Sequence, residues 1–416
     1  TTHNLADLIT LGSAHEGLDK CSFGDEPVTF FKTSSFTNYS FTFHKSTKPH
    51  VNGNTLIIGG TGAGKTTLIE FLLMNCLKYP NFRLLSFDSM NGMKVFSLAM
   101  GGEYTSVGID QDMDLNPMLL PDNQMNKTFL VEWIENLCGG ATEEEKEIIN
   151  IAVNRSFDLK KDDRCLSIVR ALSLRSNLAS RLDRWLPSLE DPMKSDHVYG
   201  MLFNAKKNSL NFDKQIVSFD MNAMLSNKDV LGSLSSFIFH SFKNYIWNNP
   251  SPHALFIDEM GRYIDNRHFQ AQIKYAFQEI RKKNGIVIGA VQQPTSVIES
   301  EIGSSIISNT ATFLIFPNPS ANPSEYMQTG ENKVNLGLND SEFDWVLNSS
   351  PEDRNVMLKR EGGKSVILDI DLSGLGSLLG LFSSSNEDVA LVDKIMAKKG
   401  RGFVEEYLEK FGEREH

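Results

Sequence analysis

Residues 54–66 read Asn54-Thr55-Leu56-Ile57-Ile58-Gly59-Gly60-Thr61-Gly62-Ala63-Gly64-Lys65-Thr66. The apolar run at the start predicts a buried strand. The glycines predict a loop whose backbone amides converge on phosphate, because glycine adopts backbone angles that are closed to other residues. Lys65 adds a positive charge at the β- and γ-phosphates, and Thr66 offers its hydroxyl to Mg²⁺. The stretch is a complete P-loop, and it predicts a site for a nucleoside triphosphate.

A helix is expected directly after this loop, because apolar residues recur through 68–73 and a helix N-terminus faces the phosphate in P-loop folds. Residues 83–88 (RLLSFD) predict a second buried strand that ends in a carboxylate. Strand, helix and strand in this order predict a right-handed parallel unit. The expected ATP-binding residues are Gly59, Gly60, Thr61, Gly62, Ala63, Gly64, Lys65, Thr66 and Thr67, and Thr66 is also an expected magnesium ligand.

Further along the chain, strand and helix signals alternate. Strand-like runs occur at residues 215–220, 254–258, 285–291 and 311–316, and helical stretches occur at 230–247 and 269–283. Alternation of this kind predicts an α/β fold, a doubly wound parallel sheet with helices on both faces.

Changes in sequence texture divide the chain into five segments. They are a β-rich lead-in at 1–50, the first part of the ATPase core at 51–122, an all-α insertion at 123–213, the second part of the core at 214–372, and a C-terminal tail or helix at 373–416. Helical periodicity marks the insertion, where Thr142 resembles an N-cap followed by acidic residues. The Gly/Ser/Leu-rich patch at 373–385 is expected to be a surface loop or a mobile tail.

Composition describes an ordinary globular protein. Of 416 residues, 40% are hydrophobic and 22% are charged, and the formal net charge is −11. This net negative charge disfavours nonspecific binding to nucleic acid, although a local basic channel could still exist in an acidic protein. The four cysteines, Cys21, Cys76, Cys138 and Cys165, form no C-x-x-C pair, which fits reduced thiols in a cytosol. The sequence shows no transmembrane segment and no signal peptide, and because it does not begin with Met we expect a fragment of a longer protein.

A second motif follows at residues 254–259 (ALFIDE), an apolar strand that ends in two carboxylates. This is the expected Walker B element. Asp258 would hold the Mg²⁺ shell, and Glu259 would orient or deprotonate the attacking water. The pair favours a hydrolysing ATPase over a scaffold that only binds phosphate.

Gln292 follows the next strand and is the candidate sensor of the γ-phosphate or of the attacking water, although a strand-end amide can equally bond a neighbouring loop. ATPases of this design often complete their site with an arginine from a neighbouring subunit. Our candidate for this arginine is Arg281. It lies near the end of the expected helix at 269–283, just before the strand that leads to Gln292. Other arginines with the same potential are Arg262, Arg267, Arg354 and Arg360.

The sequence around these motifs resembles the CagE/TrbE family of type IV secretion ATPases over about residues 39–375. The resemblance is carried by 41–44 (FTFH), 53–59 (GNTLIIG), 87–88 (FD), 116–117 (NP), 181–185 (RLDRW), 217–221 (VSFDM), 257–259 (IDE), 281–285 (RKKNG), Gln292, 315–319 (IFPNP), 337–339 (GLN) and 354–359 (RNVMLK). Gly60 stands where relatives usually carry proline, a change that leaves the amide cradle intact.

The resemblance implies a RecA-like P-loop NTPase fold with an all-α insertion, preceded in full-length members by a further domain. It implies hydrolysis of Mg-ATP by a homo-oligomer similar to hexameric motors, located in the bacterial cytoplasm as a peripheral protein of the inner membrane. The implied work is assembly of a secretion machine or pilus and transfer of protein or DNA. The implied partners are other type IV secretion subunits, companion ATPases and inner-membrane components among them. By this analogy Lys65 and Thr66 bind Mg-ATP, Asp258 and Glu259 support hydrolysis, and Gln292 senses the γ-phosphate.

Two alternatives remain from the sequence. The first is a DNA translocase of the FtsK/HerA kind or a conjugative coupling ATPase, which shares the motifs but would be expected to carry a basic pore loop. The second is a structural hub that binds ATP to lock a ring and hydrolyses little. Glu259 argues against the hub, because a scaffold needs no positioned base.

Overall fold

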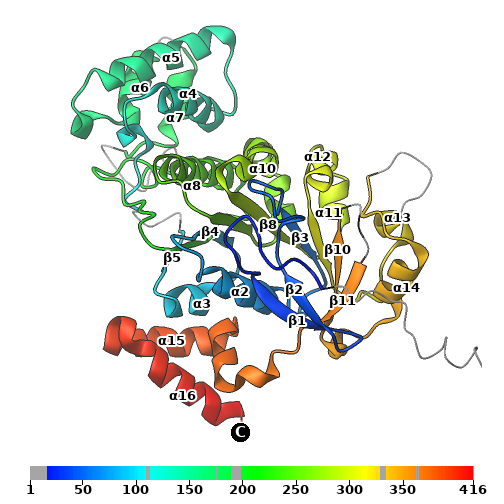
Figure 1. Ribbon diagram of the computed structural model, residues 1–416. Helices are drawn as coiled ribbons and strands as arrows, with labels where there is room; N and C mark the ends of the chain where they lie inside the picture. The colour runs from blue at the N-terminus through cyan, green and yellow to red at the C-terminus, as the bar shows by residue number, and fades with distance from the viewer. Residues whose placement is uncertain are drawn as a thin grey trace, which may run out of the picture.

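The computed structural model describes residues 16–108, 113–174, 176–188, 198–327, 334–361, 363 and 365–415. Within these residues eleven strands form one mixed sheet in the order β2-β1-β11-β10-β9-β3-β8-β7-β4-β6-β5 (Figure 1). The strands are β1 (Thr29–Thr33), β2 (Asn38–Phe41), β3 (Thr55–Ile58), β4 (Arg83–Asp88), β5 (Glu103–Ser106), β6 (Ile216–Asp220), β7 (His253–Ile257), β8 (Gly285–Val291), β9 (Thr312–Ile315), β10 (Asn355–Arg360) and β11 (Ser365–Asp369).

Helices connect and cover these strands. The α-helices are α2 (Lys65–Cys76), α3 (Lys94–Ala99), α4 (Gln124–Leu137), α5 (Glu143–Phe157), α6 (Leu166–Leu172), α7 (Leu178–Asp183), α8 (Lys228–Asn248), α9 (Met260–Ile264), α10 (Arg267–Glu279), α11 (Thr295–Ile298), α12 (Gly303–Ser308), α13 (Pro323–Tyr326), α14 (Asp340–Asn348), α15 (Asn386–Lys399) and α16 (Val404–Glu415). The 3-10 turns are η1 (Pro117–Leu119), η2 (Lys161–Asp163), η3 (Ile280–Lys283), η4 (Pro351–Asp353), η5 (Ser373–Phe382) and η6 (Gly400–Phe403).

The predicted parallel core is confirmed, and an antiparallel extension was missed. Strands β9, β3, β8, β7, β4, β6 and β5 pair in parallel. On the other side of β9, strands β10, β11, β1 and β2 continue the sheet by antiparallel pairing. The β-rich lead-in predicted at 1–50 contains β1 and β2, but no strand was predicted for β5, β10 or β11. Each of these three strands is only partly buried, so their apolar runs are interrupted and the hydrophobic signal is weak.

Two apolar cores lie on opposite faces of the sheet because successive strand residues point to opposite sides. On β3, Leu56 and Ile58 pack toward α8 and α10, whereas Ile57 packs toward α2 and α3. β3 is buried along its whole length, as a central parallel strand should be. This burial fixes the start of the P-loop within the sheet.

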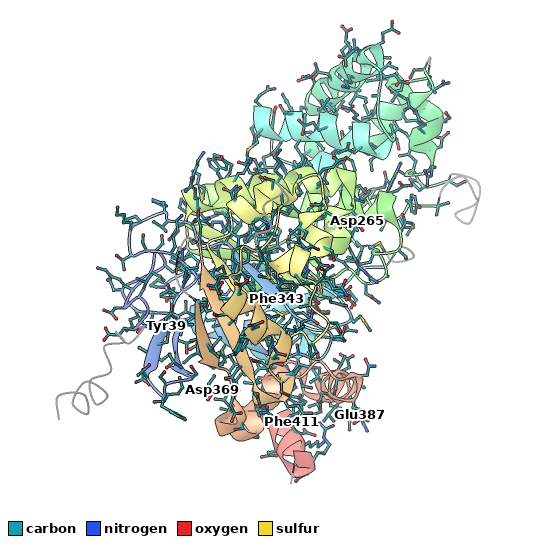
Figure 2. The ribbon with its side chains drawn as sticks, turned by 90° about the vertical axis from the view of Figure 1, so that its right-hand side faces the viewer. Tyr39, Asp265, Phe343, Asp369, Glu387 and Phe411 are labelled. Atoms are coloured by element: carbon teal, nitrogen blue, oxygen red, sulfur yellow. The ribbon has the colours of Figure 1, made fainter. Side chains whose placement is uncertain are left out.

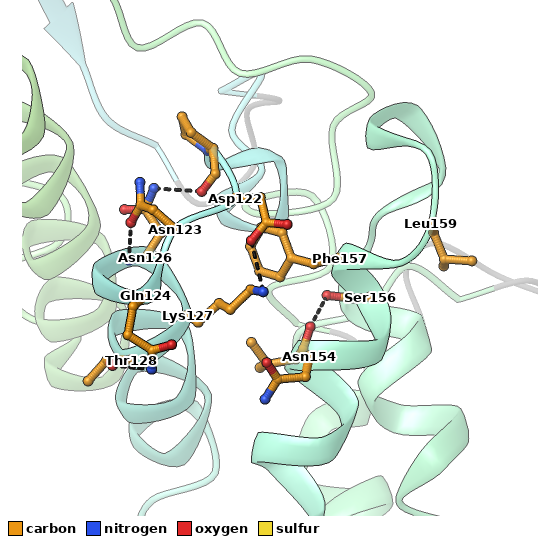
Figure 3. A network of polar contacts seen from close by, with 12 residues as sticks. Asp122, Asn123, Gln124, Asn126, Lys127, Thr128, Asn154, Ser156, Phe157 and Leu159 are labelled. Atoms are coloured by element: carbon orange, nitrogen blue, oxygen red, sulfur yellow. Dashed lines mark hydrogen bonds and ion pairs between the residues drawn. The ribbon is translucent and has the colours of Figure 1, made fainter.

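The helical insertion lies above α8 at the top of Figure 1, and its helix α4 packs alongside α8. It shares the core of the α8 face, and the indole N–H of Trp133 on α4 donates to the carbonyl of Ser233 on α8 at 2.9 Å. Figure 3 shows the start of α4, where the Asn123 side chain caps the helix by accepting from the Asn126 N–H at 2.8 Å. In the same view Lys127 forms a 2.8 Å ion pair with Asp122. The insertion is therefore packed against the ATPase core and is not a separate lobe on a linker.

Within the insertion, Thr142 is the N-cap that the sequence predicted. Its hydroxyl accepts from the Glu145 N–H at 3.2 Å, and the Glu145 carboxylate accepts from the Thr142 N–H at 2.9 Å. The two bonds form a capping box that satisfies two otherwise unpaired donors at the start of α5.

The C-terminal segment corrects one expectation. The Gly/Ser/Leu-rich patch was expected to be a surface loop or mobile tail, but η5 packs against α2, α3 and α16, and Leu381 and Phe382 are buried. The Tyr407 hydroxyl of α16 donates to the Gly380 carbonyl at 2.8 Å. Glu387 and Phe411 mark the two C-terminal helices at the bottom of Figure 2, at the opposite end of the molecule from the insertion. The packing was not predicted because glycine and serine, which favour loops, dominate the composition of the patch.

Among the described residues, no helix is long and apolar enough to cross a membrane.

Candidate nucleotide-binding site

The carboxyl ends of four neighbouring strands bring the predicted site residues to one edge of the sheet. In the register of the sheet, Ile58 pairs with Val291, and Ile257 pairs with Gly289 and Phe87. The residues that follow these positions therefore emerge side by side. Parallel α/β sheets bind ligands at this edge because loops and helix N-termini meet there.

The P-loop has the backbone geometry that its glycines predict. Gly62 and Gly64 take positive φ values of 78° and 88°, a region that side chains rarely occupy. Gly64 is the N-cap of α2, so the first amides of that helix are directed at the loop. A Cβ on Gly60 would meet no atom within 4 Å, so the space around this position would admit a side chain.

Lys65 lies at the centre of the loop. Its ammonium donates to the carbonyls of Gly59 at 2.7 Å and Gly60 at 2.9 Å. Burial lowers the pKa of Lys65, while the carboxylates of Asp258 and Glu259 oppose that shift. A positive charge held in this way attracts phosphate oxygens.

Asp258 and Glu259 follow β7. Burial and the neighbouring Glu259 raise the pKa of the Asp258 carboxyl to about 6. Glu259 has a left-handed backbone with φ of 45°, a strained conformation for a residue with a side chain. Its carboxylate accepts from the Gln292 amide at 3.1 Å and pairs with Arg262 at 3.2 Å. The structure thus joins two of the predicted site residues, Glu259 and Gln292, in one hydrogen bond.

These residues line one pocket of about 500 Å³. Its walls include Lys65, Thr66, Asp258, Glu259 and Gln292, together with the turn at Ser89–Gly92. A further wall comes from Ser384, Ser385 and Asn386 at the start of α15. This last wall was not predicted, because nothing in the sequence shows that a segment about 320 residues after Lys65 lies beside the P-loop in the folded chain.

Mg²⁺ fits this pocket through the chemistry of its walls. The ion prefers oxygen ligands and commonly uses one or two carboxylates plus the phosphates of a substrate. Asp258 and Thr66 supply a carboxylate and a hydroxyl to the same pocket. The described residues contain no group of three or more His, Cys, Asp or Glu that could hold a metal by themselves. Phosphate oxygens of a bound nucleotide would complete the coordination of such an ion.

Two further carboxylates are buried behind the pocket, and neither was predicted as a site residue. Asp88 ends β4 and accepts from the Tyr104 hydroxyl at 2.6 Å and from the Met93 N–H at 2.9 Å through one oxygen, while its other oxygen has no hydrogen-bond partner. Glu70 on α2 is fully buried and neither of its oxygens has such a partner. Burial, together with Asp88 and Asp258, raises the pKa of Glu70. The sequence signal that could have identified Asp88 is its position as the carboxylate at the end of the predicted strand at residues 83–88 (RLLSFD).

We expect Asp88→Asn to stabilise the fold at alkaline pH. Burial and Asp258 raise the pKa of Asp88 from 3.8 to about 8. A raised folded pKa means that stability is present below the unfolded pKa and is lost as the pH rises from about 4 to about 8. The uncharged amide avoids this loss, so its advantage in unfolding free energy should grow by roughly 2–4 kcal/mol between pH 5 and pH 9.

The measurement is denaturant unfolding at both pH values in EDTA without nucleotide. Asp344→Asn, which changes an exposed carboxylate on α14, is the matched control and should show no such growth. An advantage of the same size at both pH values would show that Asp88 does not titrate in this range.

The arginine candidates lie in different places. Arg262 is mostly exposed and pairs with Glu259, and Arg354 pairs with Asp371 at 3.0 Å. Arg360 donates to the Phe43 carbonyl at 2.9 Å and to Thr312 and the Thr42 carbonyl, so it has a structural role between β2, β9 and β10. Arg267 begins α10, and its side chain lies outside the described residues.

Arg281 is exposed on η3, at the end of β8 opposite to Gln292. It does not line this chain's own pocket. An arginine donated to a neighbouring subunit would also lie away from its own site, so Arg281 stays our prediction for that role.

Curated proteins of type IV secretion systems match the chain. "Type IV secretion system protein virB4" of Bartonella henselae is 27% identical over 408 residues, which cover 96% of this chain and 49% of that protein. "Protein virB4" of Agrobacterium fabrum is 26% identical over 413 residues, covering 96% of this chain and 50% of that protein. The chain thus spans about half the length of the curated relatives that it matches. No protein-family model matches it.

Solved structures share the fold. The structure of VirB4 of Thermoanaerobacter pseudethanolicus superposes with a TM-score of 0.64 at 15% identity and covers 86% of this chain and 98% of its own. The plasmid coupling protein TrwB in complex with ADP and Mg²⁺ superposes with a TM-score of 0.50 at 13% identity, covering 77% of this chain and 85% of its own. The expected RecA-like P-loop fold, with a parallel-sheet core and an inserted all-α domain, is confirmed.

Proposed function

The chain belongs to the TrbE/VirB4 family of type IV secretion ATPases, and on that premise we propose that it hydrolyses Mg-ATP to ADP and phosphate to energise a bacterial type IV secretion apparatus. The observation that carries the proposal is the single pocket lined by Lys65, Thr66, Asp258, Glu259 and Gln292. These residues come from three strand ends, and each has the chemistry that phosphoryl transfer to water requires.

Each of these residues has its own proposed role, which follows from its charge and its position. The amides of the P-loop and the ammonium of Lys65 bind the triphosphate. Thr66 and Asp258 would hold the magnesium ion, which would neutralise charge on the phosphates. Glu259 accepts a proton from the attacking water or orients it, and the Gln292 amide keeps the carboxylate in place through their 3.1 Å hydrogen bond.

The left-handed backbone of Glu259 supports this assignment of the base. A side chain held at φ of 45° costs on the order of 1–3 kcal/mol and persists where surrounding structure demands it. Here the turn directs the carboxylate out of β7 toward Gln292 and the pocket. Strained residues of this kind cluster at active sites.

The larger biological role follows from the family. We propose a homo-oligomer, a hexamer in the simplest case, at the cytoplasmic face of the inner membrane, with Arg281 completing the site of the next subunit. Its partners would be other subunits of the secretion apparatus and its exported protein or DNA. The coupling-protein and translocase alternative shares this fold, so the likeness to TrwB does not separate the two functions.

Steady-state ATP hydrolysis tests this proposal. We expect turnover per subunit to rise with protein concentration, because an interface arginine requires a neighbour, and to be indifferent to single- and double-stranded DNA. The control is the same titration without Mg²⁺, in which turnover should vanish. Strong stimulation by DNA would favour the translocase, and absence of turnover at every concentration would favour the structural hub.

A further inference from the structure

A small apolar hollow lies between the C-terminal halves of α8 and α10. Its walls include Phe242 and Ile246 of α8 and Ile280 of η3, and among the described residues it shares no lining side chain with the nucleotide pocket. Two large aromatic side chains that line the hollow remain exposed, since Trp247 is 45% exposed and Tyr275 is 37% exposed. Tryptophan and tyrosine beside an apolar hollow are typical of the centre of a protein–protein interface.

Two lysine ammonium groups lie over these rings. Lys283 Nζ is 4.3 Å from the ring centroid of Trp247, and Lys243 Nζ is 4.8 Å from the ring centroid of Tyr275. Each contact joins α8 to the segment packed beside it, so the rings and the charges are held together. Arg281 lies two residues before Lys283 on η3, and among the described residues neither of these two cations forms an ion pair. The surface therefore combines apolar area with positive charge that the described part of the chain does not neutralise.

A complementary surface lies at the mouth of the nucleotide pocket. The turn at Ser89–Gly92 lines that pocket, and the Met90 side chain of the turn is 66% exposed. Met90 and Asn91 both have left-handed backbones, with φ of 56° and 60°, a conformation that costs free energy in residues with side chains. The turn is closed by a 3.2 Å hydrogen bond from the Gly92 N–H to the Ser89 carbonyl. A strained turn that holds methionine in solvent supports a role in binding, because methionine is a flexible apolar residue common at binding surfaces.

The proposed arginine contact brings these two surfaces together. If Arg281 completes the site of the next subunit, η3 of one copy must lie at the mouth of the nucleotide pocket of its neighbour. The hollow begins on the same η3, at Ile280, and Met90 stands at that same mouth. The charges also match, because the mouth carries Asp258 and Glu259. The start of the sheet in one copy thus faces the end of the sheet in the next, which is a head-to-tail contact of the kind that closes rings.

We propose that the hollow between α8 and α10 is the docking site for a second copy of this chain, which places its Met90 beside Trp247 while the acidic mouth of its nucleotide pocket meets the cations of η3. The proposal rests on the proposed ATPase function and goes beyond it, because it identifies the two surfaces that hold neighbouring subunits together. It also gives the strained turn at Ser89–Gly92 a role, since the turn aligns the nucleotide pocket with the arginine of the next subunit.

An exchange of charge across the contact tests the proposal. Met90→Lys and Trp247→Glu should each raise the midpoint concentration of self-association by about tenfold or more, because each places a charge in an apolar contact. In the double variant the new lysine of one copy meets the new glutamate of its neighbour, so the midpoint should return to within about threefold of the wild type. Sedimentation velocity in Mg-ADP over a range of protein concentrations measures the midpoints.

Two further measurements separate the contact from effects on folding. Phe36→Glu changes an 87% exposed aromatic residue at the turn between β1 and β2, and it should leave the midpoint unchanged. In a mixture of Met90→Cys chains and Trp247→Cys chains, a short bifunctional maleimide should link the two chains, whereas neither variant alone should give this product. Phe36→Cys in place of Met90→Cys is the control for the native thiols, of which Cys21, Cys76 and Cys138 are buried.

The outcomes separate this interface from the proposed function. Self-association that neither single variant weakens, or a mixture that gives no cross-link, would overturn the interface and leave the ATPase function standing. Weakening in both single variants without recovery in the double variant would show that the two surfaces do not meet. A wild type that stays monomeric at every concentration would overturn both the interface and the proposed oligomer. A wild type without Mg-ATP turnover would contradict the ATPase function, and the cross-link in Mg-ADP would then decide the interface by itself.

Discussion

Glu259→Gln is expected to abolish nearly all ATP turnover while leaving nucleotide binding intact. The amide has the shape of the carboxylate but cannot accept a proton from water, so kcat should fall roughly 10²- to 10⁴-fold. The KM for Mg-ATP should stay within about twofold, because the phosphates are bound by the P-loop. Steady-state hydrolysis with a parallel measurement of Mg-ATP binding checks both parts.

The structure supplies a sharp control for this variant. Arg262→Ala removes the ion pair to Glu259 but keeps the carboxylate and its bond to Gln292. An exposed ion pair contributes at most about 1 kcal/mol to stability, so both variants should fold and assemble as the wild type does. If Glu259→Gln retained more than about a tenth of the turnover, Glu259 would not be the base.

Lys65→Ala should lose both binding and turnover. The ammonium is the charge nearest to the phosphates, and its contacts within the loop show that it lies inside the phosphate cradle. Removing a preorganised charge of this kind costs roughly 10³-fold in kcat/KM. Unlike Glu259→Gln, this variant should also weaken Mg-ADP by more than about tenfold, because charge-assisted hydrogen bonds to the diphosphate are lost. Hydrolysis assays and calorimetry on the same samples distinguish the two variants.

The fold of Lys65→Ala should be unaffected, since burial disfavours the charged side chain at this position. Lys394→Ala, which removes an exposed lysine of α15, is the matched control and should keep full activity. Normal Mg-ADP affinity in Lys65→Ala would mean that the loop does not grip phosphate through this residue.

The sequence predicted six of the seven parallel strands to within a residue or two, because these six are apolar runs bounded by polar loops, whereas the partly exposed β5 was missed. β4 and β8 begin and end where the sequence placed them. The predicted helix at 230–247 is α8, and the helix at 269–283 divides into α10 and η3. β10 and β11 were missed because partly exposed strands alternate weakly and their pairing partners lie far away in the sequence.

The residues of the nucleotide site also divide into those that the sequence predicted and those that it did not. Lys65 and Thr66 were predicted from the P-loop that follows β3, and Asp258, Glu259 and Gln292 were predicted because they follow apolar strands. Parallel pairing brings these strand ends together. The wall from Ser384 to Asn386 was not predictable in this way. It depends on a chain segment that meets the P-loop only after η5 has packed.

The sequence by itself therefore determined the class of ligand and the residues that meet its phosphates, since a P-loop is a local structure whose glycines and lysine act within eight residues. Only the tertiary structure decided how the carboxylates are buried, how Glu259 and Gln292 are joined, and which distant segments complete the pocket. Those features depend on long-range packing. Desolvation and contacts between segments hundreds of residues apart have no signature in any short stretch of sequence.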